Sequence, residues 1–239
     1  MSDSVISRPW LQPCETATNS TSEKTLSGVR TLRSATLWNP ERFAREQIRS
    51  LVRQVFLSTA TPPVRQIVFS AADSETDVLG ICLRVGEELA SETAGTVAVA
   101  GDSERIVIEV ASTAVEIRDV TDPDSMRLRH MARRMTRNLW LVPKETDFAT
   151  TGSLHSHLGA LRDEFDYSIV EAPVPGASNE TSAMAQIADG VVLVLSANRT
   201  RRATARHIKE RLDSVSARIL GIVLSDRTFP VPERIYSFL

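Results

Sequence analysis

The residues with the clearest chemical potential lie between a predicted buried strand and a predicted helix. Residues 70–79 read Ser-Ala-Ala-Asp-Ser-Glu-Thr-Asp-Val-Leu, so this stretch holds three carboxylates and neither glycine nor lysine. A phosphate-binding loop in such a connection needs glycines that aim backbone N–H groups at the anion, a lysine that neutralises it, and a serine or threonine for magnesium. Asp73, Glu75 and Asp77 would instead repel a triphosphate. The strand–loop–helix order is that of a nucleotide-binding loop, whereas the residue types in the loop are not.

Carboxylates also stand at the ends of two other predicted strands. Asp102 follows the apolar run 96–100, and Glu171 follows the strand 167–170. Parallel sheets bind ligands beyond the carboxyl ends of their strands, so Glu171 is a candidate for holding a magnesium shell. Glutamate reaches one methylene further than aspartate, which disturbs a tightly positioned site. Asp102 could orient water or a metal ion, but a turn carboxylate is the simpler interpretation.

Other catalytic and metal-binding patterns are missing. His155 and His157 are two residues apart and have no third ligand nearby, so we expect no metal site. The nucleophile pattern Gly-x-Ser-x-Gly is absent. Cys14 and Cys82 make no disulfide framework, which favours a reducing compartment, and Cys82 falls on the apolar face of a predicted helix. We expect no catalytic residue from these groups.

The elements that would position these side chains alternate along the chain. Predicted strands fall at 66–70, 96–100, 105–110, 167–170, 190–196 and 219–224. Predicted helices fall at 40–56, 79–90, 154–165, 183–188 and 201–215. Short, largely apolar strands that alternate with helices predict an α/β fold, with a mainly parallel β-sheet flanked by helices on both faces.

Composition divides the chain into two parts. Residues 1–38 are rich in serine and threonine and show no apolar period, so we predict a disordered arm there. The folded domain is predicted over 39–239, because Asn39 is a suitable N-cap and Pro40 a suitable first helical residue.

Charge and hydropathy exclude several classes of protein. The chain has 28 basic and 30 acidic residues, a balance that indicates neither nucleic-acid binding nor attraction to anionic lipid. The longest apolar run, 191–195, is far too short to span a bilayer, and the N-terminus lacks a signal-peptide core. One basic segment, 126–137, has apolar residues at loosely helical spacing. It is either a solvated helix face or a phosphate contact.

Several stretches occur in an order that carries a family resemblance. They are Asn-Leu-Trp-Leu-Val-Pro at 138–143, the segment 161–173, the segment 188–195, Thr-Arg-Arg at 200–202, and the segment 220–236. Together they resemble the cytoplasmic P-loop ATPase domain of bacterial tyrosine kinases of capsular and exopolysaccharide biosynthesis, which are relatives of the MinD/ParA deviant Walker ATPases. The resemblance covers residues 40–239 and implies a P-loop NTPase-like fold.

The resemblance also implies which positions correspond to the nucleotide-binding motifs of that family. The Walker A loop corresponds to Ser74, Glu75, Thr76, Asp77, Val78 and Leu79, the second Walker motif to Gly101 and Asp102, and Walker B to Glu171. Ser74 and Thr76 then replace glycines, and Asp77 replaces the lysine. Val78 replaces the residue that binds magnesium, and Gly101 a catalytic aspartate. The motifs are therefore degenerate.

Other features of the family are kept only in part. An oligomerisation motif on the first helix corresponds to Glu46, Arg49 and Arg53, with the second arginine displaced by one residue. The family's autophosphorylated tyrosine cluster is reduced to Tyr236, and Ser225 stands where an asparagine usually follows the last core strand.

These departures predict a catalytically degenerate pseudokinase, a regulatory or scaffolding subunit in capsular or exopolysaccharide biosynthesis and export. Active members use ATP and Mg²⁺, whereas we expect no cofactor here. The expected partners are a polysaccharide co-polymerase membrane protein, an active kinase paralogue, or further copies of the chain. The expected location is the cytoplasm, at the inner face of the membrane through a partner and without direct insertion.

Two other functions stay open. The first is an active ATP-dependent tyrosine autokinase with an atypical P-loop, which would recruit a cation from Arg199, Arg201, Arg202 or the segment 127–137. The second is a positioning protein of the MinD/ParA type, which the C-terminal resemblance disfavours.

Overall fold

The computed structural model describes residues 39–59, 62–102, 105, 127–144, 151–176 and 179–227. The predicted arm, residues 1–38, lies outside the described residues, as does Tyr236. The strand predicted at 105–110 also falls outside them except for Arg105, which is helical.

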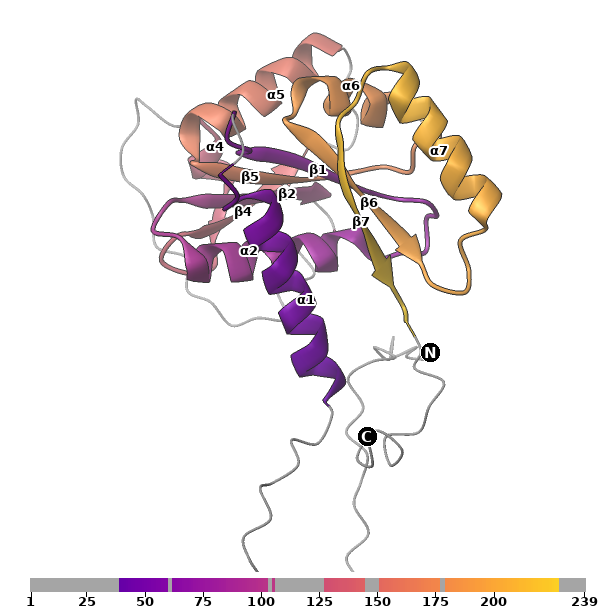
Figure 1. The fold of residues 1–239 in the computed structure, drawn as a ribbon. Helices are drawn as coiled ribbons and strands as arrows, with labels where there is room; N and C mark the ends of the chain where they lie inside the picture. Colours follow the sequence, from indigo (N-terminus) through magenta and orange to yellow (C-terminus); the bar gives the residue numbers. More distant parts are fainter. Residues whose placement is uncertain are drawn as a thin grey trace, which may run out of the picture. The chain divides into compact units, whose positions relative to one another are not determined.

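Helices and strands alternate through the described part of the chain (Figure 1). The elements are α1 (Pro40–Val55), β1 (Gln66–Ala71), α2 (Val78–Glu92), β2 (Val97–Asp102), α4 (Arg127–Met131), β3 (Arg133–Arg134), β4 (Leu139–Lys144), α5 (Thr151–Glu164), β5 (Tyr167–Ala172), α6 (Glu180–Ile187), β6 (Gly190–Ser196), α7 (Arg202–Ser214) and β7 (Ile219–Ser225).

The strands form one seven-stranded sheet in the order β3-β4-β2-β5-β1-β6-β7. Every pairing is parallel except that of β3 with β4, which is antiparallel. The central strand β1 is buried along its whole length, as its apolar sequence predicts. This arrangement confirms the predicted α/β fold with a mainly parallel sheet.

Helices cover both faces of the sheet, and each face has its own apolar core (Figure 1). Phe69 points to the face covered by α1 and α2, where it meets side chains such as Val52 and Leu89. Its neighbour Val68 points to the opposite face, which is covered by α4, α5, α6 and α7. Alternation along β1 therefore divides the core into two layers, which hold the strand ends in fixed positions.

The first helix begins where the sequence predicts. The Asn39 side chain accepts hydrogen bonds from the backbone N–H groups of Glu41 and Arg42, at 2.8 and 3.1 Å, and Pro40 is the first helical residue. None of the described helices is long and apolar enough to span a bilayer.

The basic segment is only partly helical, although its apolar residues have loosely helical spacing. The helix α4 ends at Met131, and Arg133–Arg134 forms the edge strand β3. The Arg134 guanidinium lies over the Trp140 ring, 5.5 Å from its centroid, and donates to the carbonyl groups of Thr136 and Arg137. Stacking on a strand residue is a tertiary contact that helical spacing does not record, so part of this basic run is structural.

Candidate functional site

Three neighbouring strands bring the predicted motif positions to one edge of the sheet. Strands β2, β5 and β1 are adjacent and parallel, so their carboxyl ends lie side by side. The loop after β1 therefore meets Asp102 at the end of β2 and Glu171 near the end of β5. The structure assembles the positions that the sequence singled out.

Asp77 caps the helix that follows the loop. Its carboxylate accepts a hydrogen bond from the Gly80 N–H at 3.1 Å. A Cβ atom on Gly80 would lie only 2.2 Å from Asp77 Oδ2, so a larger residue there would displace the Asp77 carboxylate from its capping position. A helix N-terminus attracts anions, and here a side-chain carboxylate supplies the negative charge that a phosphate would bring.

Inside the loop, Thr76 turns inward. It is buried and donates from its hydroxyl to Asp73 Oδ1 at 2.8 Å. Val78 and Leu79 are also buried and pack in the core beneath α1 and α2. The Thr76 hydroxyl is thus already engaged, and Val78 has neither an exposed side chain nor an oxygen for a metal ion.

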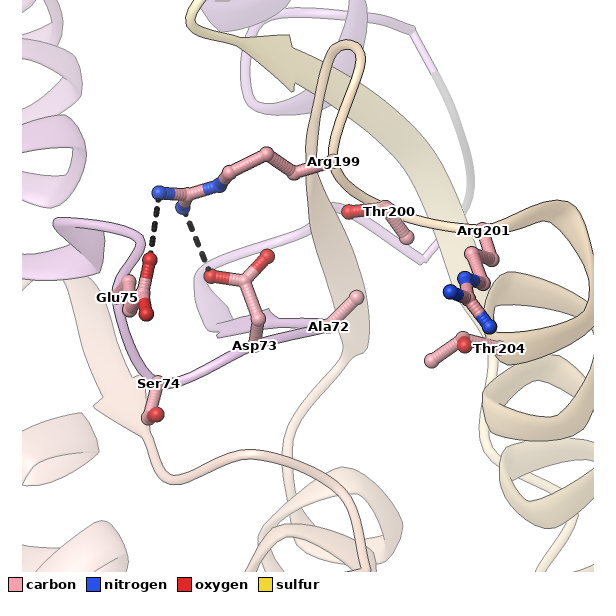
Figure 2. Close-up of a pocket in the computed structure, with 8 residues that line it drawn as sticks. All are labelled: Ala72, Asp73, Ser74, Glu75, Arg199, Thr200, Arg201 and Thr204. Atoms are coloured by element: carbon pink, nitrogen blue, oxygen red, sulfur yellow. Dashed lines mark hydrogen bonds and ion pairs between the residues drawn. The ribbon is translucent and has the colours of Figure 1, made fainter.

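Arg199, in the loop between β6 and α7, reaches across to the same segment (Figure 2). Its guanidinium donates to Glu75 at 2.9 Å and to Asp73 at 3.1 Å. This arginine was among the candidate cations of the sequence analysis. The structure assigns it to two carboxylates of the loop.

Arg105 links two motif positions that are far apart in sequence. One guanidinium nitrogen donates to Glu171 Oε1 at 2.8 Å, and the other donates to Asp77 Oδ1. The Arg105 backbone N–H is held by Asp102 Oδ1 at 3.2 Å. A protein cation therefore bridges Asp77 and Glu171, which the family resemblance assigns to the Walker A lysine and Walker B positions.

Burial sets the electrostatics of Glu171. Its side chain is only 12% exposed, and burial raises its pKa above the ordinary value of 4.5. Arg105 opposes this shift most strongly, and the backbone N–H of Asp102, 3.2 Å from Oε2, opposes it further. The negative form of Glu171 depends on these donors.

Gly101 is fixed by close packing. A Cβ atom there would lie 2.5 Å from Leu79 Cδ1 and 2.9 Å from Glu171 Oε2. A side chain at position 101 would therefore require Leu79 and Glu171 to move.

We expect Arg105→Ala to destabilise the fold by about 1–2 kcal/mol at neutral pH, because Glu171 loses its cation. This expected loss of stability is small for a broken ion pair because the Arg105 side chain is 45% exposed. The pKa of Glu171 should rise further. Since that pKa is raised on folding, the stability linked to protonated Glu171 is present below 4.5 and lost as pH rises through the folded value. This loss should be larger in the variant.

Urea unfolding from pH 4 to 8 and a carboxyl NMR titration measure both effects. Arg199→Ala is the matched control, because it removes a cation from exposed Glu75 and leaves Glu171 paired. An unchanged Glu171 pKa in Arg105→Ala would contradict the assigned pairing.

A shallow pocket of about 320 Å³ lies beside the loop (Figure 2). It is lined by Ala72, Asp73, Ser74, Glu75, Arg199, Thr200, Arg201 and Thr204. Its acidic wall is the loop, and its basic wall comes from the segment after β6. No group of three or more histidine, cysteine, aspartate or glutamate side chains suited to a metal ion occurs among the described residues.

The oligomerisation positions lie on α1 and contact the neighbouring helix. Arg49 donates to Glu88 at 2.6 Å and lies 3.6 Å from Glu46. Arg53 donates to Glu92 at 2.8 Å. These arginines help to join α1 to α2 within one chain, and their role between chains stays a prediction.

Arg105 is the site residue that sequence reasoning missed. It stands three residues after the strand-end residue Asp102 and was assigned to a strand. The indication available from the sequence was the carboxylate of Glu171 at a strand end, because a carboxylate buried there needs a cation from elsewhere in the fold. Nothing in the local pattern distinguishes Arg105 from the chain's other arginines.

Comparison with known proteins agrees with this fold. No family model matches the sequence. The chain is distantly homologous to the tyrosine-protein kinase CpsD of Streptococcus agalactiae, 29% identical over 83 residues, which are 35% of this chain and 36% of that protein. The match thus spans about a third of the length of the curated relatives.

Solved structures share the architecture over a larger part of the chain. The VpsO kinase domain matches with a TM-score of 0.59 and 16% identity, covering 79% of this chain and 98% of that one. The kinase domain of the Escherichia coli tyrosine kinase ETK matches with a TM-score of 0.58 and 15% identity, covering 87% and 88%. MinD of Aquifex aeolicus matches with 0.51 and 16%, covering 67% and 68%. These likenesses establish the fold.

Proposed function

We propose that this protein is a catalytically degenerate relative of the bacterial tyrosine kinases and acts as a regulatory or scaffolding subunit in capsular or exopolysaccharide biosynthesis. The distant homology to CpsD and the shared fold support the family relationship. The observation that carries the degeneracy is the bridge from Arg105 to Asp77 and Glu171.

The bridge reverses the charge pattern that nucleotide binding requires. A P-loop lysine brings positive charge to the phosphates, and a Walker B carboxylate supports a magnesium ion. Here Asp77 brings negative charge to the position of the P-loop lysine, and Arg105 pairs with Glu171 at the position of the Walker B carboxylate. A nucleotide would have to displace one ion pair and tolerate the uncovered carboxylates.

The same packing supports a binding role. Both apolar cores are intact around the loop, and the Asp73 carboxylate accepts hydrogen bonds from Thr76 and Arg199 through Oδ1. A domain that keeps its fold without a ligand presents a constant surface to a partner. We infer that this partner is a polysaccharide co-polymerase membrane protein or an active kinase paralogue, at the inner face of the membrane.

Calorimetric titration with Mg-ATP tests the proposal on the wild-type chain. We expect no saturable heat up to about 1 mM nucleotide, which corresponds to binding weaker than about −4 kcal/mol. The matched variant Glu171→Ala should behave in the same way. Micromolar binding by the wild type that is lost in Glu171→Ala would contradict the proposal.

That contrary result would favour the alternative function, an ATP-dependent tyrosine autokinase with an atypical P-loop. The observation in its favour is the basic wall of the pocket, where Arg201 and Thr204 stand opposite the loop. Under the alternative, Arg201→Ala would weaken Mg-ATP binding at least about tenfold, whereas under our proposal it changes nothing measurable.

A further inference from the structure

Positive charge is concentrated in one short segment of the chain. Residues 127–137 contain five of the 28 basic residues, all arginines, and none of the 30 acidic residues. They form α4, β3 and the turn that leads to β4, and the strand order places β3 at the end of the sheet opposite β7. The near-neutral charge of the whole chain therefore conceals a strongly basic region.

Two of these arginines lie beside the same indole ring. Arg134 is directly opposite Trp140 in the antiparallel pair of β3 with β4, and its guanidinium is 5.5 Å from the ring centroid. The Arg129 guanidinium is 5.6 Å from the same centroid and 5.0 Å from that of Phe165. Stacking on aromatic rings restricts the orientation of a guanidinium and leaves its charge intact.

Carboxylates do not neutralise these charges. Within the part of the chain that the structure describes, no ion pair involves Arg129, Arg134 or Arg137. Arg129 donates to the Glu164 carbonyl at 2.6 Å, and Arg134 donates to the carbonyls of Thr136 and Arg137. We call Arg129, Arg134 and Arg137 the basic edge.

The acidic side chains beside the basic edge have other donors. Glu164, the last residue of α5, accepts from the backbone N–H groups of Leu128 and Arg129, each at 3.0 Å. Asp166 accepts from the backbone N–H and the hydroxyl of Thr96, at 2.7 and 2.9 Å. Both carboxylates are thus engaged in positioning the backbone.

An exposed apolar side chain accompanies the basic edge. Met131, the last residue of α4, is 60% exposed and is one of four exposed large hydrophobic side chains among the described residues. Arg134 and Arg137 are exposed as well. Clustered arginines bind lipid phosphates, and an adjacent apolar side chain can enter the headgroup layer.

We propose that the basic edge binds an anionic phospholipid surface directly. The three arginines come from α4, β3 and the following turn, so they form an extended row that suits a surface with many phosphates. The exposed Met131 favours lipid over an acidic protein, because the headgroup layer accepts apolar side chains beside cations. The contact is peripheral and requires no inserted helix.

This contact does not rest on the proposed function. Strands β4, β2 and β5 lie between β3 and β1, and the loop after β1 forms the candidate site. Vesicle binding and Mg-ATP binding therefore report on different parts of the molecule. A failure of one leaves the expectation for the other unchanged.

Co-sedimentation of the full chain with lipid vesicles tests the proposal. At about 50 mM salt, the wild type should bind vesicles with about 30% phosphatidylglycerol in phosphatidylcholine and should not bind vesicles of phosphatidylcholine alone. Arg134→Gln/Arg137→Gln should lower the partition coefficient at least about tenfold, because each arginine near an anionic surface contributes about fivefold. Arg134→Lys/Arg137→Lys retains the charge and should retain most of the binding.

Arg206→Gln/Arg218→Gln is the matched control. It removes two exposed arginines outside the basic edge, so it changes the net charge equally and should retain vesicle binding. Circular dichroism establishes that each variant is folded. Equal losses in both glutamine variants, a lysine variant that also loses binding, or a wild type that does not prefer anionic vesicles would overturn the proposal. Binding to polyglutamate without vesicle binding would overturn it in favour of an acidic protein partner.

A fluorescent label locates the contact without altering any arginine. In a Cys14→Ser background, where Cys82 is buried, Met131→Cys carries an environment-sensitive dye beside the basic edge. Its emission should shift to the blue when anionic vesicles are added, because the headgroup layer is less polar than water. The control Ser214→Cys, exposed at the end of α7, should show no shift. Equal shifts at both positions, or none at position 131, would contradict the assigned surface.

Discussion

A variant that carries five substitutions is expected to bind Mg-ATP, whereas the wild type is expected not to bind it. Its changes are Ser74→Gly, Thr76→Gly, Asp77→Lys, Val78→Ser and Arg105→Asn. We expect a dissociation constant of about 10–100 µM. The affinity for Mg-ATP would then be about ten to a hundred times that of a wild type at the 1 mM limit, which corresponds to about 1.4–2.7 kcal/mol of binding free energy. Calorimetry with Mg-ATP measures it.

The gain has three physical sources. Removing Asp77 frees the N-terminus of α2, whose Gly80 N–H the carboxylate now occupies. The lysine supplies positive charge at the phosphate position. Replacing Arg105 releases Glu171 and prevents repulsion between an arginine and the new lysine.

The fourfold variant that keeps Arg105 is the matched control. It should bind ATP more weakly than the fivefold variant, because Arg105 still neutralises Glu171. Val78 is buried, so its change to serine costs about 1–2 kcal/mol of stability, and circular dichroism should first establish that both variants are folded. A folded fivefold variant without affinity would mean that the loop backbone has been remodelled beyond nucleotide binding.

Gly101→Asp, which restores the aspartate of the second Walker motif, should destabilise the fold by about 3–5 kcal/mol. The new Cβ would press on Leu79 and on Glu171 Oε2, at 2.5 and 2.9 Å. The new carboxylate would also face Glu171 across a buried space and raise the pKa of both groups. Urea unfolding measures the loss.

Two further variants separate volume from charge. Gly101→Ala brings only the steric contact and should cost about 1–3 kcal/mol. Gly101→Asn has the volume of aspartate without its charge, so its difference from Gly101→Asp should shrink as pH falls and one carboxyl becomes protonated. A difference that stays constant between pH 4 and 8 would contradict the charge argument.

Local sequence predicts much of the fold because its strands are strongly apolar. The predicted strand at 66–70 corresponds to β1, Gln66–Ala71. Asn39 and Pro40 locate the start of α1 for reasons confined to neighbouring residues.

Contacts between distant residues were not predictable in this way. The strand β3 pairs with β4, and Arg134 lies over the Trp140 ring of that strand, which helical spacing within the basic segment does not indicate. Arg105 meets Asp77 and Glu171 across the sheet edge, at sequence separations of 28 and 66. The carboxylates at the site were predictable from their positions at strand ends, whereas the cation that balances them required the fold.

The ion pairs of Arg105 with Asp77 and Glu171 hold the site together with a group from the same chain. A site held together by a soluble ligand is filled in proportion to the concentration of that ligand. A guanidinium on the same chain has a fixed effective concentration that no metabolite pool can change. Under the proposed function, the conformation of the loop after β1 does not follow the concentration of ATP in the cell.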